Sequence, residues 1–392
     1  MEQPRKIAIA CQGGGIHGAF TCGVLEQILQ EAEALQKAET GAKHFDIIGL
    51  SGTSAGALNA FMVWYGLLDA KQNHFAEARK ALNKLWDTFQ VQKSGELSMN
   101  NFAQFFFKLQ GVGLDFKSPA PPLFYDWLMS TLHGWSALEN SFLPWLDLGE
   151  IRPEFYDFAQ LLKTCAPNFA RIQGLGKKPQ LLIGAVEILS GKFEVFDSHD
   201  QRKGPDARPI SYEAVEASGT LPEVRRAQKI PGLKNSYGQD PLYWDGLFSQ
   251  NPPVREFIAG KEDIEGVPDE IWVIRINPQK REQEPKLLGE IEDRRNELSG
   301  NLSLNQELDF IQKVNDWIGR YPNDEFVKGK KPIDIFMITM SPDKAELDVA
   351  SKFNRDPVFV KGLREHGAVR GREFLKLWAR SQARTWPQDA IL

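Results

Sequence analysis

A serine with a glycine two positions away on each side is the residue of this sequence best suited to covalent chemistry. Residues 52–56 read Gly-Thr-Ser-Ala-Gly, with Ser54 at the centre. In a G-x-S-x-G elbow, a sharp turn from a strand into a helix holds the serine Oγ at the edge of a sheet, where helix N-terminal amides favour negative charge. A plain strand-to-helix turn fits the same five residues. The context favours the elbow, because the apolar segment 45–50 precedes it and the almost wholly apolar segment 57–68 follows.

A glycine-rich loop follows the first apolar segment of the chain. Residues 13–18 read Gly-Gly-Gly-Ile-His-Gly and come directly after the apolar run 7–11. Without side chains, backbone N–H groups can converge on a small anion. The candidate donors of such an oxyanion hole are Gly13, Gly14, Gly15 and Gly18.

A dinucleotide cradle is the competing interpretation, because the same loop also fits the pattern G-x-G-x-x-G. A nucleotide site requires an acidic residue at the end of the second strand to bind a ribose hydroxyl. Here residues 49–52 read Gly-Leu-Ser-Gly, and the elbow occupies the place of the carboxylate. We therefore favour the oxyanion hole, and we expect no metal, nucleotide or organic cofactor.

A serine nucleophile needs a base, and Asp245 is the first candidate. Asp245 is followed by Gly246 after a short predicted strand. An ordinary turn explains an Asp-Gly pair equally well when it is considered alone. A second arrangement is open, because the order Ser54, Asp245, His366 matches the order of an α/β-hydrolase triad.

The elements that must position these residues alternate between strand and helix. The first 70 residues predict strand, glycine loop, helix, strand, tight turn and buried helix, a pattern typical of a parallel sheet covered by helices. Ser211 is expected to cap a short helix. Further strands are predicted at 180–186, 192–196, 271–276 and 333–339, and further helices at about 287–319 and 359–384. The predicted fold class is α/β, with three layers and a mostly parallel central sheet between helices.

Composition excludes several classes of protein. The 392 residues contain 47 Lys and Arg against 52 Asp and Glu, so no basic excess indicates a nucleic-acid partner. The three scattered cysteines, Cys11, Cys22 and Cys165, form no disulfide or zinc pattern and indicate free thiols in a reducing compartment. No segment is long and apolar enough to span a bilayer. We expect a cytoplasmic protein whose membrane contact, where it occurs, is peripheral.

Four motifs in this order resemble those of the patatin-like phospholipases. They are the glycine loop, the elbow, the Ala-Ser-x-x-x-Pro stretch at 217–222 and the Asp-Gly pair at 245–246. Together they are specific, although each alone is not, and their order and spacing agree over residues 6–255. The segments 293–298 and 301–304 resemble a C-terminal extension of some bacterial members.

The resemblance implies a patatin-like catalytic domain at 6–255 and a C-terminal extension at 256–392 that continues the same sheet. It implies a Ser54–Asp245 dyad, with the amides of Gly14 and Gly15 holding the oxyanion. The expected reaction is hydrolysis of acyl esters in phospholipids, lysophospholipids or neutral lipids through an acyl-enzyme.

An aromatic-rich insertion at about 95–150 interrupts the predicted domain. Its residues include Phe105, Phe106 and Phe107. Core packing explains such a stretch. The functional interpretation is a cap that forms an acyl-chain tunnel or contacts a membrane interface, because Tyr and Trp suit interfaces.

Two residues depart from the family pattern. His17 stands where the family usually has Arg, and Leu247 stands where Gly or Ala is usual after Asp-Gly. The remaining alternative is that Leu247 narrows the site and the protein binds lipids without hydrolysing them.

Overall fold

The computed structural model describes ten parts of the chain: residues 4–37, 45–69, 73–91, 158–173, 179–222, 226–258, 266–286, 288–340, 347 and 350–380. The cap predicted at about 95–150 lies outside the described residues.

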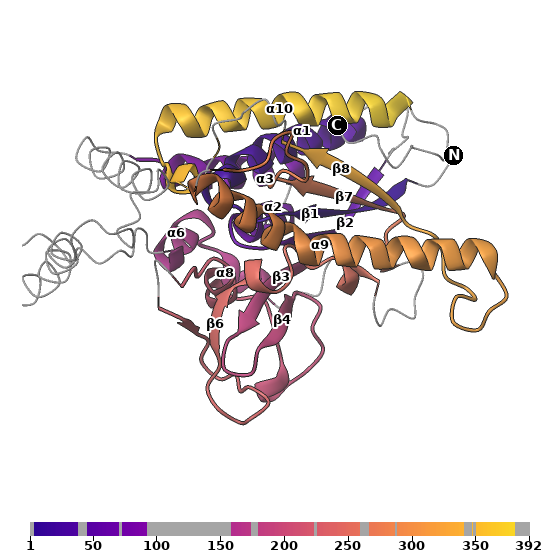
Figure 1. Ribbon diagram of the computed structural model, residues 1–392, viewed down its shortest axis with the longest axis horizontal. Helices are drawn as coiled ribbons and strands as arrows, with labels where there is room; N and C mark the ends of the chain where they lie inside the picture. The colour runs from indigo at the N-terminus through magenta and orange to yellow at the C-terminus, as the bar shows by residue number, and fades with distance from the viewer. Residues whose placement is uncertain are drawn as a thin grey trace, which may run out of the picture.

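An eight-stranded sheet forms the centre of the molecule (Figure 1). Its strands are β1 (Arg5–Cys11), β2 (Phe45–Gly52), β3 (Gln180–Glu187), β4 (Lys192–Asp197), β5 (Gln228–Lys229), β6 (Leu242–Asp245), β7 (Glu270–Arg275) and β8 (Asp334–Thr339). The neighbours β3, β2, β1, β7 and β8 run parallel. Strands β4 and β6 pair with β3 in the antiparallel direction, and β5 pairs with β6 in the same way.

Helices cover both faces of this sheet. The α-helices are α1 (Gly18–Lys37), α2 (Ala55–Asp69), α3 (His74–Phe89), α6 (Phe158–Cys165), α7 (Phe169–Ile172), α8 (Tyr212–Ser218), α9 (Leu288–Arg320) and α10 (Pro357–Arg380). Short 3-10 turns are η1 (Gly15–His17), η3 (Gly204–Asp206), η4 (Gly246–Phe248), η5 (Arg255–Phe257) and η7 (Ala350–Phe353). In Figure 1, α1 and α10 lie above strands β1, β2, β7 and β8, and α9 lies below them.

Alternating side chains of the strands supply two cores. Ile9 of β1 packs with residues of α1, α2, α3 and α10, whereas Ala8 and Ala10 face the other way, toward Leu304 and Ile311 of α9. This alternation is what a strand buried on both faces requires. The predicted three-layer α/β fold with a mostly parallel sheet is confirmed.

Strands β2 and β6 meet end to end along one edge of β3. Strand β3 has three partners. Strand β4 occupies one edge of β3, so β2 and β6 must share the other edge. The last residue of β2, Gly52, lies opposite Ile183, and the last residue of β6, Asp245, lies opposite Ala185. Two residues of β3 span about 7 Å. The end of β6 therefore faces the residues that follow β2.

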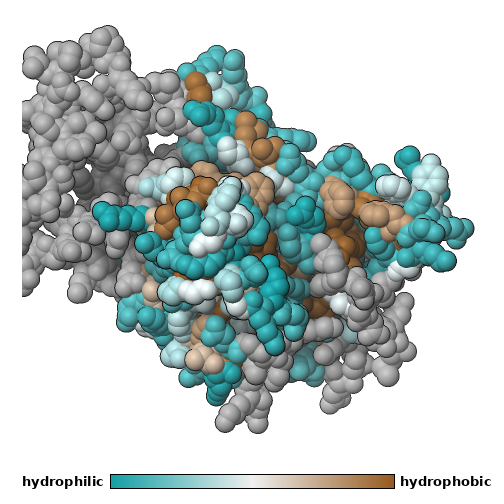
Figure 2. Space-filling view, turned by 90° about the horizontal axis from the view of Figure 1, so that it is seen from below, coloured by the Kyte–Doolittle hydropathy of each residue, from teal (hydrophilic) through white to brown (hydrophobic). Residues whose placement is uncertain are grey.

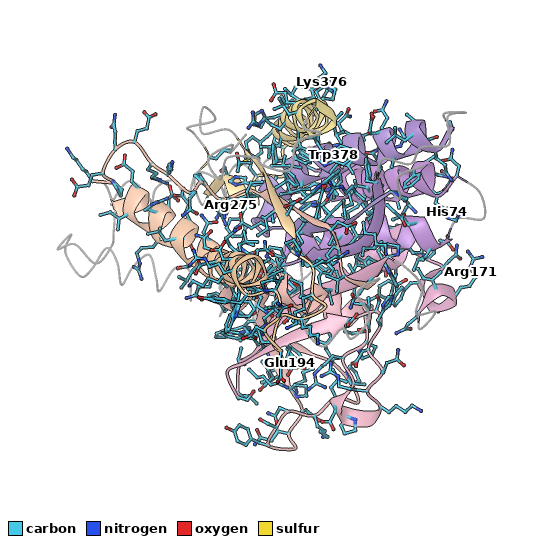
Figure 3. All side chains as sticks on the ribbon, turned by 90° about the vertical axis from the view of Figure 1, so that its right-hand side faces the viewer. His74, Arg171, Glu194, Arg275, Lys376 and Trp378 are labelled. Atoms are coloured by element: carbon cyan, nitrogen blue, oxygen red, sulfur yellow. The ribbon has the colours of Figure 1, made fainter. Side chains whose placement is uncertain are left out.

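Helix α10 packs closely on α1 through small residues. A Cβ atom added at Gly367 of α10 would lie 2.0 Å from the carbonyl oxygen of Phe20 in α1. Farther along α10, the indole of Trp378 donates a hydrogen bond of 2.8 Å to Glu270 of β7. Figure 3 shows Trp378 on the side of α10 that faces the sheet. The last described helix is thus anchored to both α1 and β7.

Gly367→Ala is expected to destabilise the protein by about 1–3 kcal/mol, because the added methyl group forces α10 away from α1. Gly362→Ala is the matched control on the same helix, since no atom lies within 4 Å of its added Cβ. Alanine favours a helix over glycine, so this control should raise stability by up to about 1 kcal/mol. Denaturant unfolding measures both changes. Equal effects of the two substitutions would contradict the close contact.

Candidate active site

Ser54 occupies a tight turn between β2 and α2. Its φ is 55°, in the left-handed region that residues other than glycine seldom adopt. Two acceptors of Ser218 hold the Ser54 amide, namely the carbonyl oxygen at 3.1 Å and Oγ at 3.0 Å. The carbonyl oxygen of Ser54 accepts from Leu58 in the first turn of α2. The predicted strand, turn and helix are all present, and the serine is fixed at the helix N-terminus.

The two glycines of the elbow are required by close backbone approach. A Cβ atom at Gly52 would lie 2.3 Å from the carbonyl oxygen of Gly56. One at Gly56 would lie 2.1 Å from the carbonyl oxygen of Cys11, the last residue of β1. Because no side chain fits at either position, the elbow packs directly on the backbone that leads into the glycine loop.

Asp245 lies beside this elbow and is only 1% exposed. Its Oδ1 accepts a hydrogen bond of 2.8 Å from the amide of Leu247. A Cβ atom at Gly246 would lie 2.8 Å from Cγ2 of Thr53. The residue after Asp245 therefore packs on the residue before Ser54, as the end-to-end arrangement of β2 and β6 requires.

The four glycines predicted as oxyanion donors differ in their hydrogen bonds. Gly13 donates its amide to Oδ1 of Asn251 at 2.7 Å. Gly18 donates its amide to the carbonyl oxygens of Gly15 and Ile16. In the part of the chain that the structure describes, no hydrogen bond occupies the amides of Gly14 and Gly15. Among the four glycines, these two amides are therefore available as donors.

Two residues that hold the site together had no role in the sequence analysis. Ser218 donates its hydroxyl to the carbonyl oxygen of Gly184 at 2.6 Å while accepting from the Ser54 amide. Asn251 fixes the amide of Gly13. Ser218 lies within the Ala-Ser-x-x-x-Pro motif at 217–222, so the sequence carries a signal for its role. Asn251 carries no local signal, because its partners are remote in sequence.

His17, a residue of the glycine loop, is buried. Its side chain is 3% exposed, and its Nε2 lies 2.8 Å from Oγ of Ser351. Burial, with a smaller effect of the nearby Lys352, lowers the pKa of His17 to about 3. The imidazole is therefore neutral near pH 7 and supplies no positive charge at the position where Arg is usual.

A lysine from the C-terminal region lies against the glycine loop instead. A Cβ atom at Gly15 would lie 2.4 Å from the carbonyl oxygen of Lys352 and 3.1 Å from its Cβ. Its Nζ donates to Oδ1 of Asn277 at 3.3 Å. Burial lowers the pKa of Lys352, while the carboxylates of Glu297, Asp293 and Asp245 oppose that shift.

His366, the histidine of the alternative triad, packs against α1. His366 is on α10, with its ring centroid 5.4 Å from that of Phe20 in α1.

Cys11, Cys22 and Cys165 are free and buried. The described residues contain no group of three or more His, Cys, Asp or Glu that could hold a metal ion. None of the helices described here has the length and apolar character needed to cross a membrane.

The buried neutral His17 predicts a loss of stability in acid. Its pKa is about 3 in the folded protein and near 6.5 when exposed, so the unfolded chain binds more protons between these values. The free energy of unfolding should therefore fall as the pH drops from about 6.5 toward 3, by up to about 1.4 kcal/mol per pH unit from this residue. His17→Gln does not titrate, so its denaturation midpoints should depend less steeply on pH. Identical slopes for the two proteins would refute this assignment.

A family model agrees with the motifs. The family model described as patatin-like phospholipase matches residues 9–258. No curated protein matches the chain. Among solved structures, the chain is similar to VipD from Legionella pneumophila at 15% sequence identity, with 96% of this chain and 67% of that chain covered and a TM-score of 0.37. Because the family model matches more than half of the sequence, the chain belongs to the patatin-like phospholipase family.

Proposed function

We propose that this protein is a serine lipid acyl hydrolase in which Ser54 is the nucleophile and Asp245 is its base. The observation that carries the proposal is the meeting of β2 and β6 along one edge of β3. It directs the elbow and the aspartate toward the same point. Family membership supports lipid acyl hydrolysis in general, and the site supports the specific roles.

The reaction divides into two steps that use the same groups. Ser54 Oγ attacks the ester carbonyl and gives its proton to the Asp245 carboxylate, while the amides of Gly14 and Gly15 donate to the developing oxyanion. Collapse of this intermediate releases the alcohol, which takes the proton, and leaves an acyl-enzyme. A water molecule then gives its proton to Asp245 and attacks the acyl carbonyl, and collapse releases the fatty acid and returns the proton to Ser54.

The departure at Leu247 is compatible with this chemistry. A Cβ atom added at Gly300 of α9 would lie 3.1 Å from Cδ1 of Leu247. The Leu247 side chain therefore extends toward α9, while its backbone amide donates to Asp245. The backbone contact with Asp245 does not depend on the side chain at position 247, so this departure alone does not argue against catalysis.

The proposed substrates are acyl esters of phospholipids, lysophospholipids or neutral lipids, reached by peripheral contact with a lipid surface. Several large apolar side chains of α9 are exposed, among them Leu298, Leu302, Phe310 and Trp317. On the face shown in Figure 2, hydrophobic areas (brown) are separated by hydrophilic side chains. That an aromatic cap at about 95–150 controls the access of lipid acyl chains to Ser54 stays a prediction.

Ser54→Ala should abolish ester hydrolysis and labelling by a fluorophosphonate while leaving the fold intact, because it removes the nucleophile and keeps the backbone. Hydrolysis of a short-chain nitrophenyl ester and mass spectrometry of the labelled protein measure both effects. Thermal unfolding controls for stability. Labelling that persists in this variant would place the nucleophile elsewhere.

Asp245→Asn should lower kcat by at least about 100-fold, since an amide cannot accept the serine proton. His366→Ala should change kcat by less than about three-fold, because the dyad uses no histidine. Steady-state kinetics on one soluble ester compares the two variants. The reverse ranking, with His366 essential and Asp245 dispensable, would establish the triad.

A further inference from the structure

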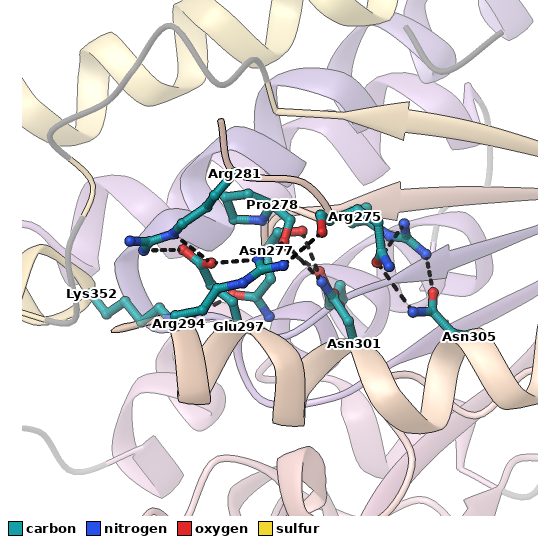
Figure 4. A network of polar contacts seen from close by, with 11 residues as sticks. Arg275, Asn277, Pro278, Arg281, Arg294, Glu297, Asn301, Asn305 and Lys352 are labelled. Atoms are coloured by element: carbon teal, nitrogen blue, oxygen red, sulfur yellow. Dashed lines mark hydrogen bonds and ion pairs between the residues drawn. The ribbon is translucent and has the colours of Figure 1, made fainter. Parts of the chain in front are cut away.

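Helix α9 lies outside the region matched by the family model, yet it contacts the backbone of the site. Its contact is made by a glycine and an asparagine, Gly300 and Asn301, which are both buried. Figure 4 shows Asn301 pointing from α9 toward Asn277 and Pro278, which follow β7. Helix α9 therefore contacts the segment after β7, at the same C-terminal end of the strands as the proposed oxyanion loop.

The first connection runs through Gln12, the residue directly before the glycine loop. Its side-chain amide donates to Oδ1 of Asn301 at 2.8 Å and to the carbonyl oxygen of Gly300 at 3.2 Å. Its Oε1 accepts from the amides of Ile276 and Asn277, each at 2.9 Å. Gln12 is fully buried, so these bonds replace water for both polar atoms of its side chain.

The second connection runs through Asn251. Its Oδ1 accepts from the Gly13 amide at 2.7 Å, and its Nδ2 donates to the Gly300 carbonyl oxygen at 3.1 Å. The backbone amide of Asn251 also donates to Oγ of Ser303, one turn farther along α9. Two buried amide side chains thus join α9 to Gln12 and Gly13, immediately before Gly14.

Gly300 permits this approach. A Cβ atom at this position would lie 2.6 Å from Nδ2 of Asn277. Glycine inside a helix costs about 1 kcal/mol relative to alanine, so its presence in the middle of α9 fits a need for contact. One turn earlier, Glu297 pairs with Arg281 and Arg294 at 2.7 and 3.0 Å (Figure 4). These ion pairs fix the turn of α9 that carries the contact.

We propose that α9 is a positioning element of the active site, in which Asn301 and Gly300 act through Gln12 and Asn251 to hold the glycine loop. This inference rests on the proposed function, because it treats the amides of Gly14 and Gly15 as oxyanion donors. Oxyanion donors act in the transition state more than in the bound substrate. Loosening the loop should therefore lower kcat and leave KM nearly unchanged.

The test replaces Asn301 with alanine and measures kinetics on a soluble short-chain nitrophenyl ester. Asn301→Ala should lower kcat about ten-fold and change KM less than about two-fold, because a small displacement of a preorganised donor is costly. Asn305→Ala is the matched control, since Asn305 lies one turn farther on α9 and bonds Arg275 and Gln279 instead of the loop. It should stay within about two-fold of the wild type.

Hydrogen exchange followed by mass spectrometry provides a second measurement that needs no activity. Peptides covering residues 12–18 should exchange faster in Asn301→Ala than in Asn305→Ala. Gly300→Ala is the second variant, and it should show the same two effects, because its methyl group separates α9 from the loop. An unchanged kcat, a loss confined to KM, or equal exchange in the Asn301 and Asn305 variants would overturn the proposal. An inactive wild type would instead reject the proposed function, while the exchange comparison would still decide whether α9 holds the loop.

Discussion

The end-to-end meeting of β2 and β6 on β3 brings the residue after the proposed base against the residue before the proposed nucleophile. Gly52 allows the elbow to close on Gly56, Gly56 admits the elbow against β1, and Gly246 admits the end of β6 against Thr53. Ser54 keeps a positive φ because hydrogen bonds to Ser218 and the start of α2 determine its conformation. A strained backbone conformation persists only where the surrounding contacts hold it in place. Here those contacts hold a serine at a helix N-terminus.

The C-terminal part of the chain completes this arrangement. Strands β7 and β8 extend the parallel sheet beyond β1, α10 covers one face, and α9 covers the other. The hydrogen bond from Gln12 to Gly300 joins residues 288 positions apart. Lys352 likewise packs its backbone and Cβ against Gly15 of the glycine loop, in which His17 is neutral. The proposed site thus draws on residues from both sides of position 258, where the family model ends.

Local signals made the fold and the elbow predictable. Apolar runs located β1, β2, β7 and β8, and Ser211 caps α8 as expected, with its Oγ accepting from the Ala214 amide. The strand β5 was not predicted, because two residues show no periodicity. The roles of Gln12, Asn251 and Asn301 could not be predicted either, because a polar side chain that bonds a remote backbone leaves no pattern around it. The neutral state of His17 depends on burial, which its neighbours in sequence do not reveal.

A structure of the protein after reaction with a phosphonate ester tests the central claim most directly. The phosphonate imitates the tetrahedral intermediate, so its phosphoryl oxygen marks the position of the oxyanion. The account predicts phosphorus bonded to Oγ of Ser54, the phosphoryl oxygen within about 3 Å of the amides of Gly14 and Gly15, and the Asp245 carboxylate beside the same Oγ. A phosphonate on another residue, or a phosphoryl oxygen that contacts neither glycine amide, would contradict it.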